Sequence, residues 1–98
     1  MNYELARRAT IEFDTAFAHY DQRSAKAANR FASAVDNAIE QICAYPAGAP
    51  LTSDGRYRRR SVSGFPFIIF YRDDVAPLKV VSIFHTSRDP SDAPGEAR

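Results

Sequence analysis

The most continuous β-type pattern in the chain lies between residues 57 and 85. Phe67 to Tyr71 is an uninterrupted aromatic and β-branched run with turn-forming residues on both sides, which is typical of a strand in the middle of a sheet. Ser63-Gly64 predicts a hairpin turn before this run, and residues 73–77 predict another after it. The pattern therefore predicts three consecutive antiparallel strands.

The first half of the chain shows a helical period instead. Apolar side chains recur between about Arg8 and Asp21, beginning with Ile11, and again from Phe31 to Ile42, each time on one side of the predicted helix. Ser24 is a candidate N-cap for the second helix, and Pro46 ends it. Two helices with a short connector form an antiparallel hairpin, and only the sheet offers a large apolar surface for it.

The two ends of the chain complete the predicted fold. Residues 3–5 alternate apolar and polar side chains, which fits a short edge strand, whereas the residues after His85 are polar or small. At 98 residues the chain is long enough for one domain, which we place at 1–90, and we expect 91–98 to be a flexible tail. The predicted class is α+β: a short N-terminal strand, an antiparallel helical hairpin, and a three-stranded antiparallel meander packed on the helices.

Charge changes this picture in one region only. The formal net charge is +1, and 26% of residues are charged, as in ordinary globular proteins. The stretch from Gly55 to Arg72, however, holds no acidic residue and five arginines: Arg56, Arg58, Arg59, Arg60 and Arg72. Such a patch attracts a polyanion or an acidic protein, although long cations on an exposed strand also serve simply to prevent aggregation.

Other residue types narrow the function classes. Cys43 is the only cysteine, which excludes an intramolecular disulfide, and two histidines give no basis for a zinc site. We expect no metal and no cofactor. The N-terminus has no apolar signal core, and no apolar run approaches the roughly 20 residues that a membrane span needs. We therefore expect a cytoplasmic protein without a membrane partner.

His85 and Arg88 are candidates for chemistry at the end of the last predicted strand. An imidazole can transfer protons, and a guanidinium can stabilise charge on a phosphate in its transition state, so the pair suits RNA cleavage. The alternative is that His85 packs the strand end and Arg88 binds the tail. On the residues alone the structural role is favoured, because a lone histidine serves many purposes.

Several short motifs occur in a fixed order along nearly the whole chain. They are Glu12-Phe13-Asp14-x-Ala16-xx-His19-Tyr20, Arg30-Phe31, Tyr45-Pro46, Val62-x-Gly64-Phe65-Pro66-Phe67 and His85-xx-Arg88-Asp89-Pro90. In this order and spacing the sequence resembles the RelE/ParE superfamily of bacterial toxins from type II toxin-antitoxin systems. The glycine-containing turn and the closing motif are more similar to the ParE-like branch.

The resemblance implies a toxin that a cognate antitoxin neutralises within a hetero-oligomer. ParE-like members inhibit DNA gyrase, which is the function we expect for this chain. RelE-like members are instead ribosome-dependent endonucleases that cleave messenger RNA, and this is the alternative. Two features depart from the nuclease pattern: Ser61 stands where an arginine often precedes the hairpin, and no tyrosine follows Tyr71.

The two functions assign different roles to the basic residues. If the chain is a nuclease, the resemblance implies Arg59 and Arg88 as catalytic residues, with His85 as the proton-transfer group. If it is a binding protein, the expected surface for the target or the antitoxin comprises Arg58, Arg59, Arg60, Arg72 and Arg88. As surface charges these five should tolerate alanine with little loss of stability, and Arg59 is the one we expect to approach the helix-facing side.

Overall fold

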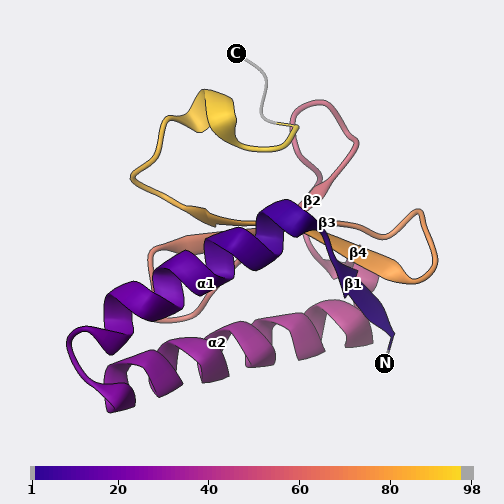
Figure 1. Ribbon diagram of the computed structural model, residues 1–98. Helices are drawn as coiled ribbons and strands as arrows, with labels where there is room; N and C mark the ends of the chain where they lie inside the picture. Colours follow the sequence, from indigo (N-terminus) through magenta and orange to yellow (C-terminus); the bar gives the residue numbers. More distant parts are fainter. Residues whose placement is uncertain (1, 96–98) are drawn as a thin grey trace.

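The described part of the chain forms four strands and two α-helices, in the order that the hydrophobic pattern predicts (Figure 1). The computed structural model describes residues 2–95. The elements are β1 (Tyr3–Leu5), α1 (Arg7–Asp21), α2 (Ala25–Ala44), β2 (Arg58–Ser61), β3 (Phe67–Arg72) and β4 (Leu78–His85), with single 3-10 turns at Pro46–Gly48 and Pro90–Asp92. The α+β class and the predicted sequence of elements are confirmed.

The sheet has the strand order β1-β4-β3-β2. Strands β2, β3 and β4 form the predicted antiparallel meander, and Gly64 in the first turn adopts the positive φ of 81° that favours glycine. The edge strand β1 runs parallel to β4, with Tyr3 opposite Leu78, so the sheet is mixed. Leu5 leads almost directly into α1, because Ala6 alone separates the strand from the helix.

The helical hairpin covers one face of the sheet (Figure 1). The Ser24 hydroxyl accepts a hydrogen bond from the Ala27 amide at 3.0 Å, which confirms it as the N-cap of α2. The helix ends at Ala44, just before Pro46. Its predicted apolar stripe, from Phe31 to Ile42, is buried against α1 and the sheet.

An aromatic cluster around Phe31 joins the hairpin to the sheet. Phe31 is fully buried, and its ring lies 5.1–5.6 Å from the rings of Phe13, Tyr20, Phe65 and Phe67. These four neighbours come from α1, the first turn of the meander and β3, so one side chain touches three parts of the fold. Tilted and edge-on aromatic pairs of this kind stabilise a core beyond the area that they bury.

The apolar pattern of α1 is only partly a core pattern. Ile11 belongs to the predicted stripe, yet 53% of its surface is exposed, whereas the small Ala9 and Ala16 are the residues of α1 that are buried. Small side chains let the helix approach β4 closely. Ile11 is consequently left at the rim of that contact, an apolar side chain in solvent.

The predicted tail begins as a packed segment. Arg8 donates to the Asp92 carbonyl oxygen at 2.7 Å, and the Gly95 carbonyl oxygen accepts from the Asp54 amide and the Ser53 hydroxyl. Residues 96–98 of the predicted tail, and Met1 of the predicted domain, lie outside the described residues. Flexibility of 91–98 stays a prediction. No helix among residues 2–95 is long and apolar enough to cross a membrane.

Replacing Phe31 with alanine tests the aromatic cluster. The change removes a fully buried ring at the meeting point of helices and sheet, so we expect the free energy of unfolding to fall by about 3–5 kcal/mol. Ile11→Ala is the matched control, because it also shortens an apolar side chain but on the exposed rim, where the change should stay within about 0.5 kcal/mol. Urea unfolding would measure both, and equal losses would contradict the assigned core.

Candidate functional site

The arginines of β2 point to opposite sides of the sheet. Arg58 and Arg60 stand opposite the buried Tyr71 and Ile69 on the helix-facing side, whereas Arg59 stands opposite Phe70. Arg59 thus lies on the face that carries no helix, which we call the outer face. The expectation that Arg59 would approach the helix-facing side is wrong, because the register of β2 against β3 turns Arg58 and Arg60 inward.

Both inward arginines are held by partners within the chain. Arg58 forms an ion pair with Asp73 at 3.0 Å and donates to the Ala49 carbonyl oxygen at 2.8 Å. Arg60 donates to the Gln41 side chain at 2.7 Å, which ties β2 to α2. These two guanidinium groups serve the packing of the edge of the sheet.

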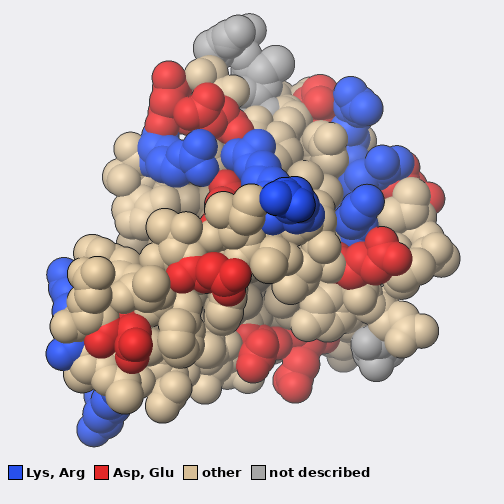
Figure 2. Space-filling model, viewed as in Figure 1, with Lys and Arg blue, Asp and Glu red and all other residues tan. Residues whose placement is uncertain are grey.

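Arg72 is paired as well, at the turn between β3 and β4. It makes two hydrogen bonds of 2.9 Å to the Asp74 carboxylate, and this contact lowers the pKa of Asp74 below its usual value. Figure 2 shows acidic side chains among the basic ones on this side of the molecule. Two of the five arginines in this stretch, Arg58 and Arg72, are therefore paired with acids that follow it in the sequence.

Arg59 and Arg88 meet on the outer face. Their guanidinium carbons lie 6.0 Å from the Phe70 ring centre and 5.1 Å from the Phe84 ring centre respectively, and the two rings pack edge to face 6.0 Å apart. Both rings are buried. A hollow of about 220 Å³ lies here, bordered by these four residues and by the segment after β4. The structure thus assembles a small arginine-aromatic surface from residues far apart in the sequence.

Glu12 lies at the edge of β4, at the point where β1 stops. The pairing of β1 ends opposite Val80, so the next part of β4 has no neighbouring strand on that side. The Glu12 carboxylate takes its place by accepting hydrogen bonds from the Ile83 amide at 2.9 Å and from the buried Ser82 hydroxyl at 2.7 Å. A helix side chain therefore accepts hydrogen bonds at the edge of β4 where a neighbouring strand would otherwise provide the partners.

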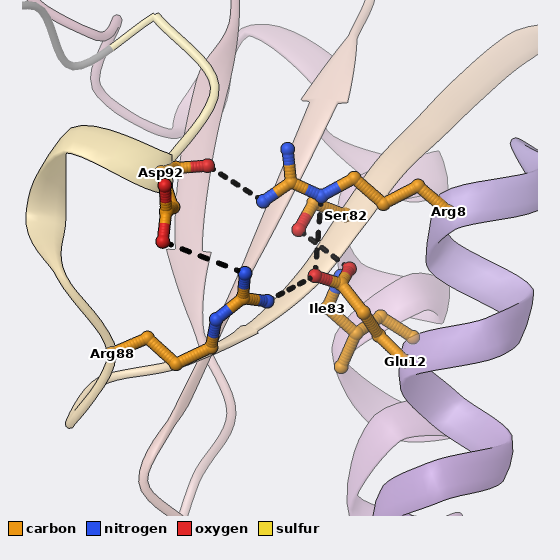
Figure 3. A network of polar contacts seen from close by, with 6 residues as sticks. All are labelled: Arg8, Glu12, Ser82, Ile83, Arg88 and Asp92. Carbon is orange, nitrogen blue, oxygen red and sulfur yellow. Dashed lines mark hydrogen bonds and ion pairs between the residues drawn. The ribbon is translucent and has the colours of Figure 1, made fainter.

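Two arginines balance the charge of this carboxylate (Figure 3). Arg8 lies one helical turn before Glu12 and contacts it at 3.1 Å, and Arg88 approaches from the end of β4 at 2.9 Å. Both arginines also contact Asp92, Arg8 at its carbonyl oxygen and Arg88 at its carboxylate, 3.7 Å away. The network joins α1, the sheet edge and the C-terminal segment. Glu12 appears in the motif pattern of the sequence, but no sequence signal assigned it a partner.

His85 lies on the helix-facing side, away from Arg59. Its Nδ1 accepts a hydrogen bond from the Ser87 amide at 3.0 Å, with the Ser87 hydroxyl at 2.7 Å, and its ring packs edge-on against Phe67 at 4.9 Å. Of the three residues proposed for a nuclease, His85 and Arg88 border one cleft between α1 and β4, whereas Arg59 lies on the outer face.

His85 borders a cleft that sequence reasoning missed. The cleft measures about 500 Å³ and lies between α1 and β4, lined by Ile11, His19, Tyr20 and Phe67 among others. No sequence signal pointed to it, because Ile11 follows the same apolar period as a core residue although the structure leaves it exposed. No group of three metal-binding side chains occurs among residues 2–95.

The strand order, the helical hairpin on one face and the meander together define a RelE/ParE-type toxin fold. Within this class, the family model described as "ParE toxin of type II toxin-antitoxin system, parDE" matches residues 3–90, so the chain belongs to the ParE toxin family. Its members are the toxin half of a system in which an antitoxin is the partner.

A solved structure supports the fold independently. A chain of the "Chromosomal ParDE TA system from P. aeruginosa" superposes with a TM-score of 0.62 at 19% sequence identity. The similarity covers 87% of this chain and 95% of the other. No curated protein sequence matches this chain.

Glu12→Ala tests whether the carboxylate completes the sheet. The change leaves the buried Ser82 hydroxyl and the Ile83 amide without their acceptor. We therefore expect the free energy of unfolding to fall by about 3 kcal/mol. Glu40→Ala, an exposed acid on α2, is the charge-matched control and should change stability little. Amide hydrogen exchange should quicken at Ile83 in the first variant alone. Unchanged protection at Ile83 would contradict the role given to Glu12.

Arg58→Ala and Arg72→Ala separate packed from exposed arginines. Arg58 is mostly buried between Asp73 and the Ala49 carbonyl. Its replacement by alanine should therefore lower the free energy of unfolding by about 1–3 kcal/mol, more than the replacement of an exposed arginine would. The ion pair of Arg72 is open to solvent, and its removal should leave the unfolding midpoint nearly unchanged. Denaturation curves of both variants decide this, and equal midpoints would refute the distinction.

Proposed function

We propose that this protein inhibits DNA gyrase and is neutralised by a cognate antitoxin. The match to the ParE toxin family over residues 3–90 carries this proposal. Inhibition of this kind needs a surface complementary to the target and requires no catalytic group. The proposal places the toxin in the cytoplasm, where gyrase and DNA are found.

The arrangement of the candidate residues favours a binding protein over a ribonuclease. General acid-base cleavage requires its groups within hydrogen-bond reach of one phosphate. Here His85 and Arg88 border the same cleft, but Arg59 lies on the outer face and the Arg88 guanidinium is already bound to the Glu12 carboxylate. These positions support a role in binding for the arginines.

The outer face is our proposed surface for the target or the antitoxin. Arg59 and Arg88 project over the buried rings of Phe70 and Phe84, and arginine and aromatic residues are enriched among the residues that dominate binding energy. The other three arginines of the expected set contribute less directly, since Arg58 and Arg60 face the helices and Arg72 is paired with Asp74. Arg59 and Arg88 are therefore the side chains on which we expect target binding to depend most.

A gyrase assay with the purified protein tests the proposal. We expect the wild-type protein to inhibit supercoiling by gyrase and to cause filamentation with a DNA-damage response when it is induced in bacteria. Arg59→Glu should weaken inhibition by at least tenfold, because it reverses the charge at the centre of the proposed surface. Arg7→Glu is the matched control, because it reverses the charge of an exposed arginine at the start of α1, away from the outer face, and it should inhibit normally.

His85→Ala separates the two modes of action. A gyrase inhibitor keeps its toxicity without His85, and cellular messages remain intact during growth arrest. Loss of toxicity in this variant, with cleaved messages and prompt translation arrest in the wild type, would overturn the proposal in favour of the ribonuclease. Co-expression of the antitoxin encoded beside the toxin should restore growth in either case.

A further inference from the structure

A hollow on the outside of α2 is lined by hydrogen-bond donors. It measures about 680 Å³ and is bordered by one row of side chains along the helix and by the first turn of the meander: Lys26, Asn29, Arg30, Ser33, Ala34, Asn37 and Phe65. All five polar side chains can donate a hydrogen bond, and none is acidic. A surface with this composition fits an anionic ligand that presents several acceptor atoms.

The cations of this hollow have no partner within the described part of the chain. Lys26 and Arg30 make no hydrogen bond or ion pair among residues 2–95, and both are exposed. Arg58, Arg72 and Arg88 are by contrast each paired with an acid. Lys26 and Arg30 therefore keep charge available to a partner on the helical hairpin, and Figure 2 shows basic side chains at the end of the molecule that holds the connection between α1 and α2.

The charges along α2 oppose the helix dipole. The N-terminal end of a helix is partially positive and is stabilised by acidic side chains, yet the first turn of α2 holds no acid and does hold Lys26. Arg30 follows one turn later, whereas the acids Asp36 and Glu40 lie in the C-terminal half, and the last turn has no basic residue. This order is unfavourable for the helix alone. It concentrates positive potential at one end of α2, which suits an anionic ligand there.

The spacing of the row matches a nucleic-acid backbone. Lys26, Arg30, Ser33 and Asn37 succeed one another on one side of the helix, and the row extends about 16 Å at 1.5 Å per residue. One DNA strand places about five phosphates along that axial length. Arginine, lysine, serine and asparagine are the side chains that most often bind phosphate oxygens. A protein segment that docked as an amphipathic helix would need an apolar groove, whereas five of the seven residues that line this hollow are polar.

We propose that this row on α2 binds the phosphate backbone of DNA without reading its sequence. The choice of DNA among polyanions rests on the proposed function, because gyrase acts while it holds a DNA segment. The toxin then contacts the target enzyme through its outer face and the enzyme's DNA through α2. Asn37 is the last residue of α2 that lines the hollow, so it marks the end of the proposed DNA contact. The acidic Asp36 and Glu40 do not line the hollow.

Fluorescence anisotropy with a labelled 30-base-pair duplex and the purified toxin alone tests this inference. We expect binding with a dissociation constant in the micromolar range at about 50 mM salt, weakening steeply as salt rises. The double variant Lys26→Ala with Arg30→Ala should bind at least roughly tenfold more weakly, and its slope of log affinity against log salt should be smaller by about two. Two duplexes of unrelated sequence should give the same values.

Matched variants make the result specific to α2. Arg7→Ala with Lys79→Ala removes the same two positive charges from α1 and β4 and should bind like the wild type. Lys26→Arg with Arg30→Lys keeps the charge and should restore binding, while thermal unfolding checks that each variant is folded. Equal weakening in both alanine pairs, or no binding by the wild type, would overturn the proposal. Equal competition by polyglutamate and by DNA would assign the row to an acidic protein instead.

Failure of this inference is distinct from failure of the proposed function. If the toxin binds DNA through α2 but leaves gyrase supercoiling unaffected, the DNA-binding inference holds and the proposed gyrase target is wrong. A toxin that inhibits gyrase equally well with and without Lys26 and Arg30, and whose DNA affinity is insensitive to them, would retain the target and lose the DNA surface.

Discussion

The carboxylate of Glu12 at the open edge of β4 is the interaction on which most of the structure depends. Strand β1 is only three residues long, so β4 continues past it with backbone groups that need partners. Glu12 satisfies the Ile83 amide and the Ser82 hydroxyl from a helix, and this placement brings a negative charge into a site where 13% of the side chain is exposed. Arg8 and Arg88 are then required to balance that charge. Because Arg88 also contacts Asp92, the same requirement holds the C-terminal segment against the sheet.

Charge in this protein has to be judged by what remains after internal pairing. The arginine-rich region from Arg56 to Arg72 dominates the sequence, yet most of its guanidinium groups bind carboxylates, carbonyls or an amide within the chain. The less conspicuous Lys26 and Arg30 keep their full charge for a partner. Linear clustering of one sign therefore marks where a protein carries charge, and only the fold decides whether an external anion can use it.

The local parts of the fold were predictable from sequence, and the long-range parts were not. Periodicity and turn chemistry report features that depend on residues a few positions apart. Such features are the C-terminal ends of the two helices, at Asp21 and Ala44, the Ser24 cap and the two turns of the meander. The parallel pairing of β1 with β4 and the contact of Glu12 with β4 join residues about 70 positions apart. The sequence of neither segment indicates that the other is its partner. Strand alternation places Arg59 on the opposite face of the sheet from Arg58 and Arg60. Which of the two faces meets the helices became clear only from the buried partners Tyr71 and Ile69 of β3. The exposed Ile11 followed the apolar period without joining the core, since period alone does not distinguish a core from a cleft.

The pairing of Tyr3 with Leu78 also decides when this protein can exist in its native form. Strand β1 is made before both helices, and its partner β4 is the last of the four described strands to be made. Closing so long a loop must wait for both segments, and non-local pairings of this kind slow folding. A growing chain can form its helical hairpin early, but it cannot complete the sheet until β4 has left the ribosome. The native sheet therefore arises only after β4 has been made, and products that end before β4 cannot adopt it.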